Sequence, residues 1–176
     1  MEIYVAYKDY IWMMEFVEKM LERIAMKLHG TTKVKIGENE IDFKAGYRRL
    51  PILDAIKEYA GVDLAGMGVD ELRETCKKLN VEFDPSMGEG KLIDAIFGAY
   101  CEDHLIEPTF ITDYPVAMSP LTKRHRNNPN LTERFELFVC GKELANAYSE
   151  LNDPIDQLER FEEQAALKSH GDDEAM

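Results

Sequence analysis

Residues 134–150 carry the sequence RFELFVCGKELANAYSE, and this stretch decides the fold class. Residues 134–139 and residues 143–150 each show the two-residue alternation of a strand that buries one face. Gly141 lies between them, at a position suited to a turn. The sequence therefore predicts a hairpin, and with it a sheet, in this part of the chain.

Other strands and helices are predicted on both sides of this hairpin. Alternation predicts strands at residues 1–7, 33–36, 40–43 and 109–113, with Gly37-Glu38-Asn39 as the turn of a second hairpin. Helical spacing predicts a long helix from Asp9 to a cap at Gly30, short helices at residues 51–59, 69–79 and 91–101, and a last helix from Pro154, capped by Asp153 and followed by Gly171.

These elements do not alternate regularly, so a doubly wound parallel fold is not expected. We expect an α+β fold with an antiparallel sheet, flanking helices and a small helical insertion. Residues 1–50 would hold the first strand, the long helix and the small hairpin, residues 51–105 the insertion, and residues 106–176 the remaining strands and the last helix.

The long helix carries an apolar stripe that includes two methionines. A Met-rich stripe can form an adaptable binding surface, but at helical spacing it is more often part of the core. We therefore interpret the stripe as core; its members are Met13, Phe16, Val17, Met20, Leu21, Ile24 and Leu28.

Charge and composition limit the classes of partner. The 176 residues have a net charge of −13, so most of the surface would repel a polyanion such as RNA. The basic run Lys123-Arg124-His125-Arg126 is the best local candidate for an RNA contact, although it could equally be a solvated loop. No segment has the length of a membrane span, and the three widely spaced cysteines favour a reduced cytoplasmic protein without structural zinc.

Three polar side chains of the hairpin share one face. Strand parity places Asn146, Tyr148 and Glu150 together, which gives a row with an amide, an aromatic ring and a carboxylate. Such a row suits an amine ligand of lysine shape, because the carboxylate pairs with the ammonium and the ring packs on the alkyl chain. The alternative is a solvated face of a half-exposed sheet.

Two glutamates flank the turn of the same hairpin. Glu136 and Glu143, brought together across the hairpin, could hold Mg²⁺ bound to the phosphates of a nucleotide. Glu143 has the wrong parity for the Asn146 face, so this hypothesis requires a twist or bulge near the turn. Surface glutamates on strands are common, and no phosphate-binding loop accompanies the pair.

The chain closely resembles the catalytic domain of class II lysyl-tRNA synthetases. The resemblance is strongest over residues 131–139 and 141–154, extends through Gln157 and Arg160-Phe161 to residues 171–176, and reaches back over residues 108–115 and 119–121. Residues 2–7 resemble the strand that follows motif 2 of this family. Ala117 departs from the pattern, since related sequences commonly carry an acidic residue there.

This resemblance implies roles for individual residues. Glu150 and Glu2 would hold the ε-ammonium of lysine with help from Tyr4, and Tyr148 would pack on the lysine side chain. Asn146 would bind near the reacting end and contact ATP, while Glu136 and Glu143 would hold Mg²⁺ and ATP. The family activates L-lysine with ATP to lysyl-adenylate and transfers it to tRNA(Lys), and the full-length enzyme is a homodimer.

The resemblance also implies an incomplete enzyme. Motif 1, the motif 2 arginine, motif 3 and an anticodon-binding barrel are not found, so we expect an internal piece of the catalytic domain that is inactive alone. Two alternatives remain, namely a synthetase-like paralogue that lysylates a protein, and a non-catalytic structural fragment.

Overall fold

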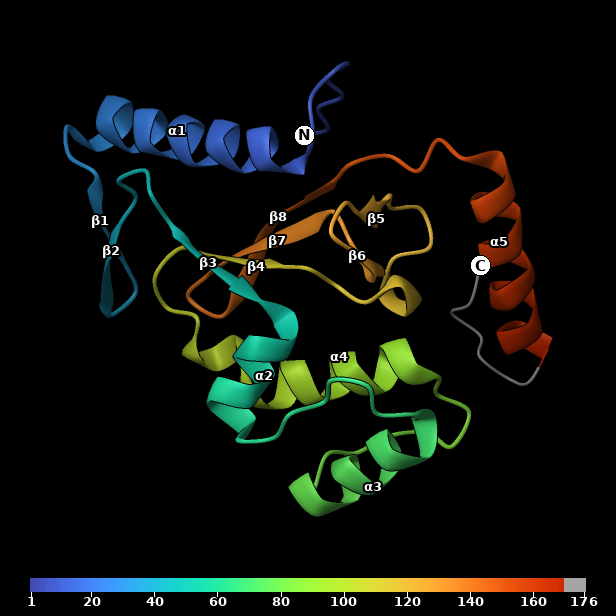
Figure 1. Cartoon of the computed structure of the whole chain (residues 1–176). Coiled ribbons are helices and arrows are strands. Elements are labelled where there is room, and N and C mark those ends of the chain that lie inside the picture. The colour runs from blue at the N-terminus through green and yellow to red at the C-terminus, as the bar shows by residue number, and fades with distance from the viewer. Residues whose placement is uncertain (170–176) are drawn as a thin grey trace.

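A four-stranded mixed sheet lies at the centre of the computed structural model, which describes residues 1–169 (Figure 1). Its strand order is β3 (Arg48–Pro51), β4 (Thr109–Thr112), β7 (Arg134–Val139) and β8 (Lys142–Tyr148). The pairs β4–β7 and β7–β8 are antiparallel, as expected. The pair β3–β4 is parallel, so the expectation of a wholly antiparallel sheet was wrong.

Helix α1 (Tyr10–His29) covers one face of this sheet (Figure 1). Asp9 caps its first turn, with Oδ1 accepting a hydrogen bond from the backbone of Trp12 at 3.1 Å, and Gly30 ends it at a φ of 71°. Both ends agree with the prediction. The core on this face joins residues from α1, β2, β4 and β7, including Tyr10, Met14, Val17, Ile41, Phe110, Phe135, Leu137 and Val139.

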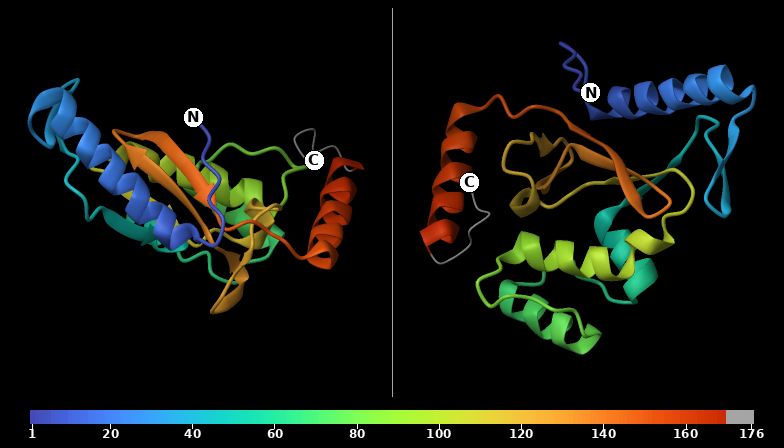
Figure 2. Two further views of the ribbon diagram at one scale, coloured as in Figure 1. Left: turned by 90° about the horizontal axis from the view of Figure 1, so that it is seen from above. Right: turned by 180° about the vertical axis from the view of Figure 1, so that it is seen from behind.

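The expectation that the whole apolar stripe of α1 lies in the core was wrong in part. Val17 is buried and Met13, Phe16, Met20 and Leu21 are half-buried, but Ile24 is 45% exposed and Leu28 71% exposed. The C-terminal half of α1 extends past β7 and β8 toward the small hairpin (Figure 2), and Ile24 and Leu28 lie in this half.

The small hairpin forms as predicted, and the shorter helices form a block on the other side of the sheet (Figure 2). The hairpin pairs β1 (Lys33–Ile36) with β2 (Asn39–Asp42), leaving Gly37 and Glu38 as its turn. The block comprises α2 (Ile52–Ala60), α3 (Val69–Leu79), α4 (Glu89–Tyr100) and the short 3-10 helix η1 (Glu102–His104). Its core continues into the sheet at Ile111 and Phe138.

The rest of the chain wraps the end of the sheet. The short 3-10 helix η2 (Val116–Met118) precedes an unpredicted hairpin of β5 (Arg124–His125) and β6 (Asn128–Thr132). Helix α5 (Pro154–Ser169) begins after Asp153, whose Oδ1 accepts a backbone hydrogen bond from Ile155 at 3.0 Å, as expected for the cap. Gly171, its expected terminator, lies outside the described residues.

The expectation of a strand at residues 1–7 was wrong. These residues adopt no strand and make no ladder with any strand of the described chain. A strand requires backbone partners on a neighbouring strand, and alternation of side chains cannot supply them. Over residues 1–169, no helix has both the length and the apolar character needed to cross a membrane.

Candidate functional site

The face of the sheet opposite α1 carries the predicted polar residues. Glu136 pairs with Asn146 and Arg134 pairs with Tyr148 across β7 and β8, so these four side chains share that face. The register then shifts between Leu137 and Phe138, and Phe138 pairs with Glu143.

This register shift turns Glu143 onto the site face. Leu144 is the extra residue of the bulge, because Leu137 pairs with Ala145 and Phe138 pairs with Glu143. Without the bulge, parity would point Glu143 away from Asn146. The bulge that the metal hypothesis required is therefore present.

Glu136 is held by three side chains. Its Oε2 accepts a hydrogen bond from the Tyr114 hydroxyl at 2.8 Å, and its Oε1 accepts one from Asn146 Nδ2 at 3.2 Å and another from Arg134. Burial, followed by the charge of Glu136, raises the pKa of Tyr114 well above its usual range. Tyr114 therefore remains a neutral hydrogen-bond donor to the carboxylate.

Glu143 lies in a negative environment. Burial, followed by the charge of Glu136, raises the pKa of Glu143, while the charge of Arg134 and a hydrogen bond with Asn146 lower it. A bound cation would relieve this repulsion. Within residues 1–169 no group of three or more His, Cys, Asp or Glu side chains is arranged to hold a metal. Two carboxylates nevertheless fit Mg²⁺, which commonly takes one or two carboxylates together with substrate phosphates and water.

Tyr148 and Glu150 continue this face toward the end of the hairpin. Burial raises the pKa of Tyr148, and the charges of Glu150 and Tyr4 raise it further. These three groups therefore lie within electrostatic range of one another. Glu150 makes an isolated bridge with Thr122, and its side chain is exposed.

Glu2 and Tyr4 are the predicted residues that the structure does not hold in place. Both belong to the N-terminal segment that forms no strand, and Tyr4 is 80% exposed. The described chain thus brings together Glu136, Glu143, Asn146 and Tyr148, places Glu150 next to them, and leaves Glu2 at the periphery.

Sequence reasoning missed two members of the site, Arg134 and Tyr114. The guanidinium of Arg134 stacks on the Tyr114 ring, with Cζ 4.7 Å from the ring centroid, and contacts both Glu136 and Asn146. Parity alone could have found Arg134, because residues 134 and 136 share a face. Tyr114 follows β4 and reaches the site only through the fold.

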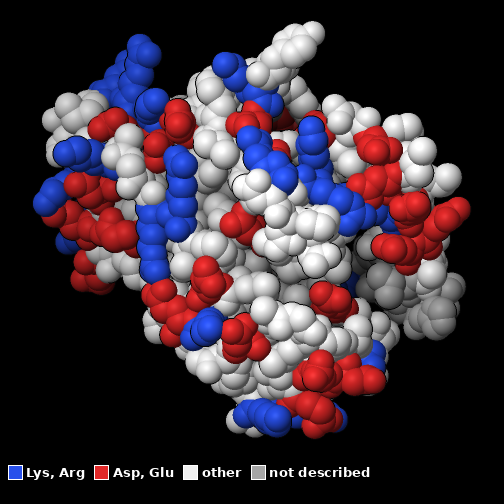
Figure 3. Space-filling view, viewed as in Figure 1, with Lys and Arg blue, Asp and Glu red and all other residues white. Residues whose placement is uncertain are grey.

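The basic run at residues 123–126 is largely engaged within the chain. Arg124 pairs with Asp156 at 3.0 Å, and Arg126 pairs with Asp9 and Glu133, both at 2.7 Å. Figure 3 shows acidic side chains along α5 beside this basic region. These pairs argue against an RNA contact, although the run is not the loop that was the alternative, because residues 124–125 form strand β5.

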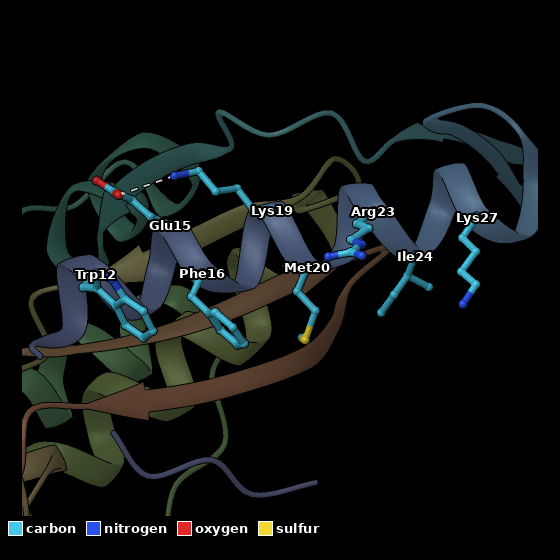
Figure 4. Close-up of a pocket in the computed structure, with 8 residues that line it drawn as sticks. All are labelled: Trp12, Glu15, Phe16, Lys19, Met20, Arg23, Ile24 and Lys27. Atoms are coloured by element: carbon cyan, nitrogen blue, oxygen red, sulfur yellow. Dashed lines mark ion pairs between the residues drawn. The ribbon is translucent and has the colours of Figure 1, made fainter. Parts of the chain in front are cut away.

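A separate apolar groove follows the exposed side of α1 (Figure 4). Its cavity volume is about 430 Å³, and Trp12 and Phe16 stack at its start, with ring centroids 5.4 Å apart. Met20 and Ile24 continue the stripe, and Lys19, Arg23 and Lys27 border it. It contains none of the predicted site residues.

The chain thus has a mixed sheet flanked by helices, with carboxylates, an amide and an aromatic ring on one face. The sequence model of the tRNA synthetases class II (D, K and N) matches residues 1–176, and the chain belongs to this family.

The similar curated proteins agree on one member of that family. A protein from Porphyromonas gingivalis named Lysine--tRNA ligase is 68% identical over 176 residues, which is 100% of this chain and 30% of that protein. Proteins of the same name from Christiangramia forsetii and Azobacteroides pseudotrichonymphae are 64% and 60% identical, over 100% and 99% of this chain and 31% and 35% of their own lengths. The chain therefore spans about a third of the relatives that it matches.

Proposed function

We propose that this chain forms the lysine pocket and part of the ATP site of a lysine--tRNA ligase. That enzyme activates L-lysine with ATP to lysyl-adenylate and transfers the lysyl group to tRNA(Lys). The observation that carries the proposal is the bulged β7–β8 register, which gathers Glu136, Glu143, Asn146 and Tyr148 on one face. The relatives' name supports the choice of lysine.

The residues at the outer end of this face would recognise lysine. Glu150 would pair with the ε-ammonium, Tyr148 would pack along the alkyl chain, and Asn146 would bind near the carboxylate that reacts. Glu2 would supply a second carboxylate to the ammonium, with help from Tyr4. Two carboxylates facing one ammonium favour lysine over neutral amino acids of similar size.

The inner carboxylates would hold the nucleotide. Glu136 and Glu143 would bind Mg²⁺, which would screen phosphate charge. The lysine carboxylate would attack the α-phosphate of ATP, the bond between the α- and β-phosphates would break, and pyrophosphate would leave. The hydrogen bonds from Tyr114 and Asn146 fix the orientation of the Glu136 carboxylate. Positioning and electrostatics, rather than a covalent bond to the protein, would supply most of the rate enhancement.

Calorimetric titration of the chain tests this proposal. L-lysine is titrated first alone and then with ATP and Mg²⁺, and the same series is repeated with Glu150→Gln. We expect lysine binding that Glu150→Gln weakens by at least about tenfold, because loss of a charge-assisted hydrogen bond costs roughly 1.5–3 kcal/mol. Glu159→Gln makes the same chemical change at an exposed position on α5 and serves as the control.

Binding of lysine that is unchanged in Glu150→Gln would contradict the assignment of this pocket. Norleucine, which keeps the α-amino group but lacks the ε-ammonium of lysine, is the second control. Its affinity should be lower than that of lysine. Equal affinity for lysine and norleucine would show that the carboxylates do not recognise the ε-ammonium.

A further inference from the structure

Arg134 lies on the polar face and contacts Glu136, Asn146 and Tyr114. Its side chain is only 17% exposed. Nε donates to Asn146 Oδ1 at 3.2 Å, and another nitrogen donates to Glu136 Oε1. The guanidinium therefore contacts one residue proposed for the substrate and one proposed for the metal.

The same guanidinium is anchored independently of those two residues. Its Nη1 donates to the backbone oxygen of Met118 and to the hydroxyl of Ser119, both at 2.9 Å. Its Cζ lies over the ring of Tyr114, 4.7 Å from the ring centroid. Tyr114 and Ser119 are 2% and 3% exposed, so this support is part of the packed interior. Arg134 is thus fixed by the segment that follows β4, and it can hold more mobile groups in place.

The contact with Asn146 decides which way the amide faces. Because Arg134 Nε can only donate, it requires the oxygen of the Asn146 amide on its side. The Asn146 nitrogen is then left to face Glu136, to which it donates at 3.2 Å. An amide turned by half a rotation would place two donors against each other and an oxygen against a carboxylate.

We propose that Arg134 is a positioning residue that fixes the orientation of the Asn146 amide and of the Glu136 carboxylate before ligands bind. The role of these two residues in binding rests on the function proposed above, whereas the orientation does not. Arg134 would act through its hydrogen bonds to Asn146 and Glu136.

A competing explanation is that Arg134 supplies only positive charge between two carboxylates. In that case a lysine residue at position 134 would serve equally well, since it carries the same charge. A lysine side chain cannot reproduce the planar guanidinium, which contacts several groups at once. These groups belong to Asn146, Glu136, Met118 and Ser119. The variant Arg134→Lys therefore separates positioning from charge.

The test combines a ligand-free measurement with a binding measurement. The side-chain amide signals of Asn146 are followed by NMR in the unmodified chain, in Arg134→Lys and in Ser119→Ala, and are assigned by their loss in Asn146→Asp. We expect Arg134→Lys to move these signals to the positions of solvent-exposed asparagines, and Ser119→Ala to move them in the same direction by less. Lysine affinity should fall about tenfold in Arg134→Lys, the cost of a misoriented hydrogen bond.

Arg48→Met serves as the matched control, because it removes an arginine from an ion pair with Glu58 and lies on β3, at the opposite edge of the sheet from β8. It should leave the Asn146 signals and the lysine affinity unchanged. Unchanged Asn146 signals in Arg134→Lys would overturn the proposal. If the unmodified chain binds no lysine, the proposed function fails for this chain, and the Asn146 signals still decide the role of Arg134.

Discussion

The buried side chain of Arg160 connects helix α5 to the segment that supports the site. Its side chain is 3% exposed and donates to the backbone oxygens of Ser119 and Thr122 at 3.0 and 2.6 Å. Asp156 neutralises it through two hydrogen bonds of 2.8 and 2.9 Å. Because Ser119 also anchors Arg134, the docking of α5 and the order of the polar face share one support.

Because of Asp156, the free energy of unfolding of the chain should depend on pH in the acid range. The hydrogen bond from Arg160, followed by that from Arg124, lowers the pKa of Asp156 from 3.8 to about 2. Its stabilisation is therefore fully present above about pH 4 and is lost as pH falls toward 2. We expect Asp156→Asn to lower the free energy of unfolding by about 2 kcal/mol at neutral pH and to reduce the loss of stability on the acid side.

Urea unfolding between pH 2 and pH 7 measures this effect. Glu159→Gln is the control, because it makes the same chemical change at an exposed position on the same helix. If Asp156→Asn and the unmodified chain lose stability in parallel between pH 4 and pH 2, another carboxylate controls the acid transition.

At the level of the element, Asp9 performs two tasks at the start of α1. Its Oδ1 caps the helix and its Oδ2 accepts a hydrogen bond from Arg126 at 2.7 Å. Asparagine preserves the cap and loses the charge, whereas alanine loses both. We expect Asp9→Asn to cost less than about 1 kcal/mol, as exposed ion pairs do, and Asp9→Ala to cost about 1 kcal/mol more.

Equilibrium unfolding of the two variants separates the cap from the ion pair. Arg126→Met supplies the third comparison, since it removes the charge partner and leaves the cap intact. Equal stabilities for Asp9→Asn and Asp9→Ala would show that the cap contributes nothing to α1.

Helices and the central hairpin could be predicted because their signals are local. Asp9, Gly30 and Asp153 mark helix ends through their own side chains or backbone, and Gly141 marks the β7–β8 turn at a φ of 69°. From the residues alone, a bulge was only a requirement for Glu143 to face Asn146. The carboxylate pair was a weak signal, and the resemblance to the synthetase family is what assigned it a role.

The other elements depend on distant partners and left no such signal. Strand β3 has the sequence Arg48-Arg49-Leu50-Pro51, and only its parallel pairing with β4 makes it a strand. Residues 1–7 alternate correctly but pair with no strand of the described chain. Arg134 shares a face with Glu136 by parity, but Tyr114 becomes a site residue only when β4 and β7 lie side by side. Sequence spacing does not contain these long-range contacts.

For the whole molecule, charge opposes contact with nucleic acid. The net charge is −13, and residues 1–50 hold nine basic and eight acidic side chains, so the whole acidic excess lies in residues 51–176. The arginines of the run at residues 123–126 already pair with Asp156, Asp9 and Glu133. An RNA contact there would have to break these pairs.

We therefore expect this chain alone to bind tRNA(Lys) no more tightly than about 10⁻⁴ M at physiological salt, the weak end of non-specific binding. Fluorescence anisotropy with labelled tRNA measures the affinity, and Arg124→Met should not change it. Micromolar binding that is lost in Arg124→Met would restore the basic run as an RNA contact. Because that run spans β5 and lies beside α5, such a result would also place the tRNA next to the helix that is docked by Arg160 and Asp156.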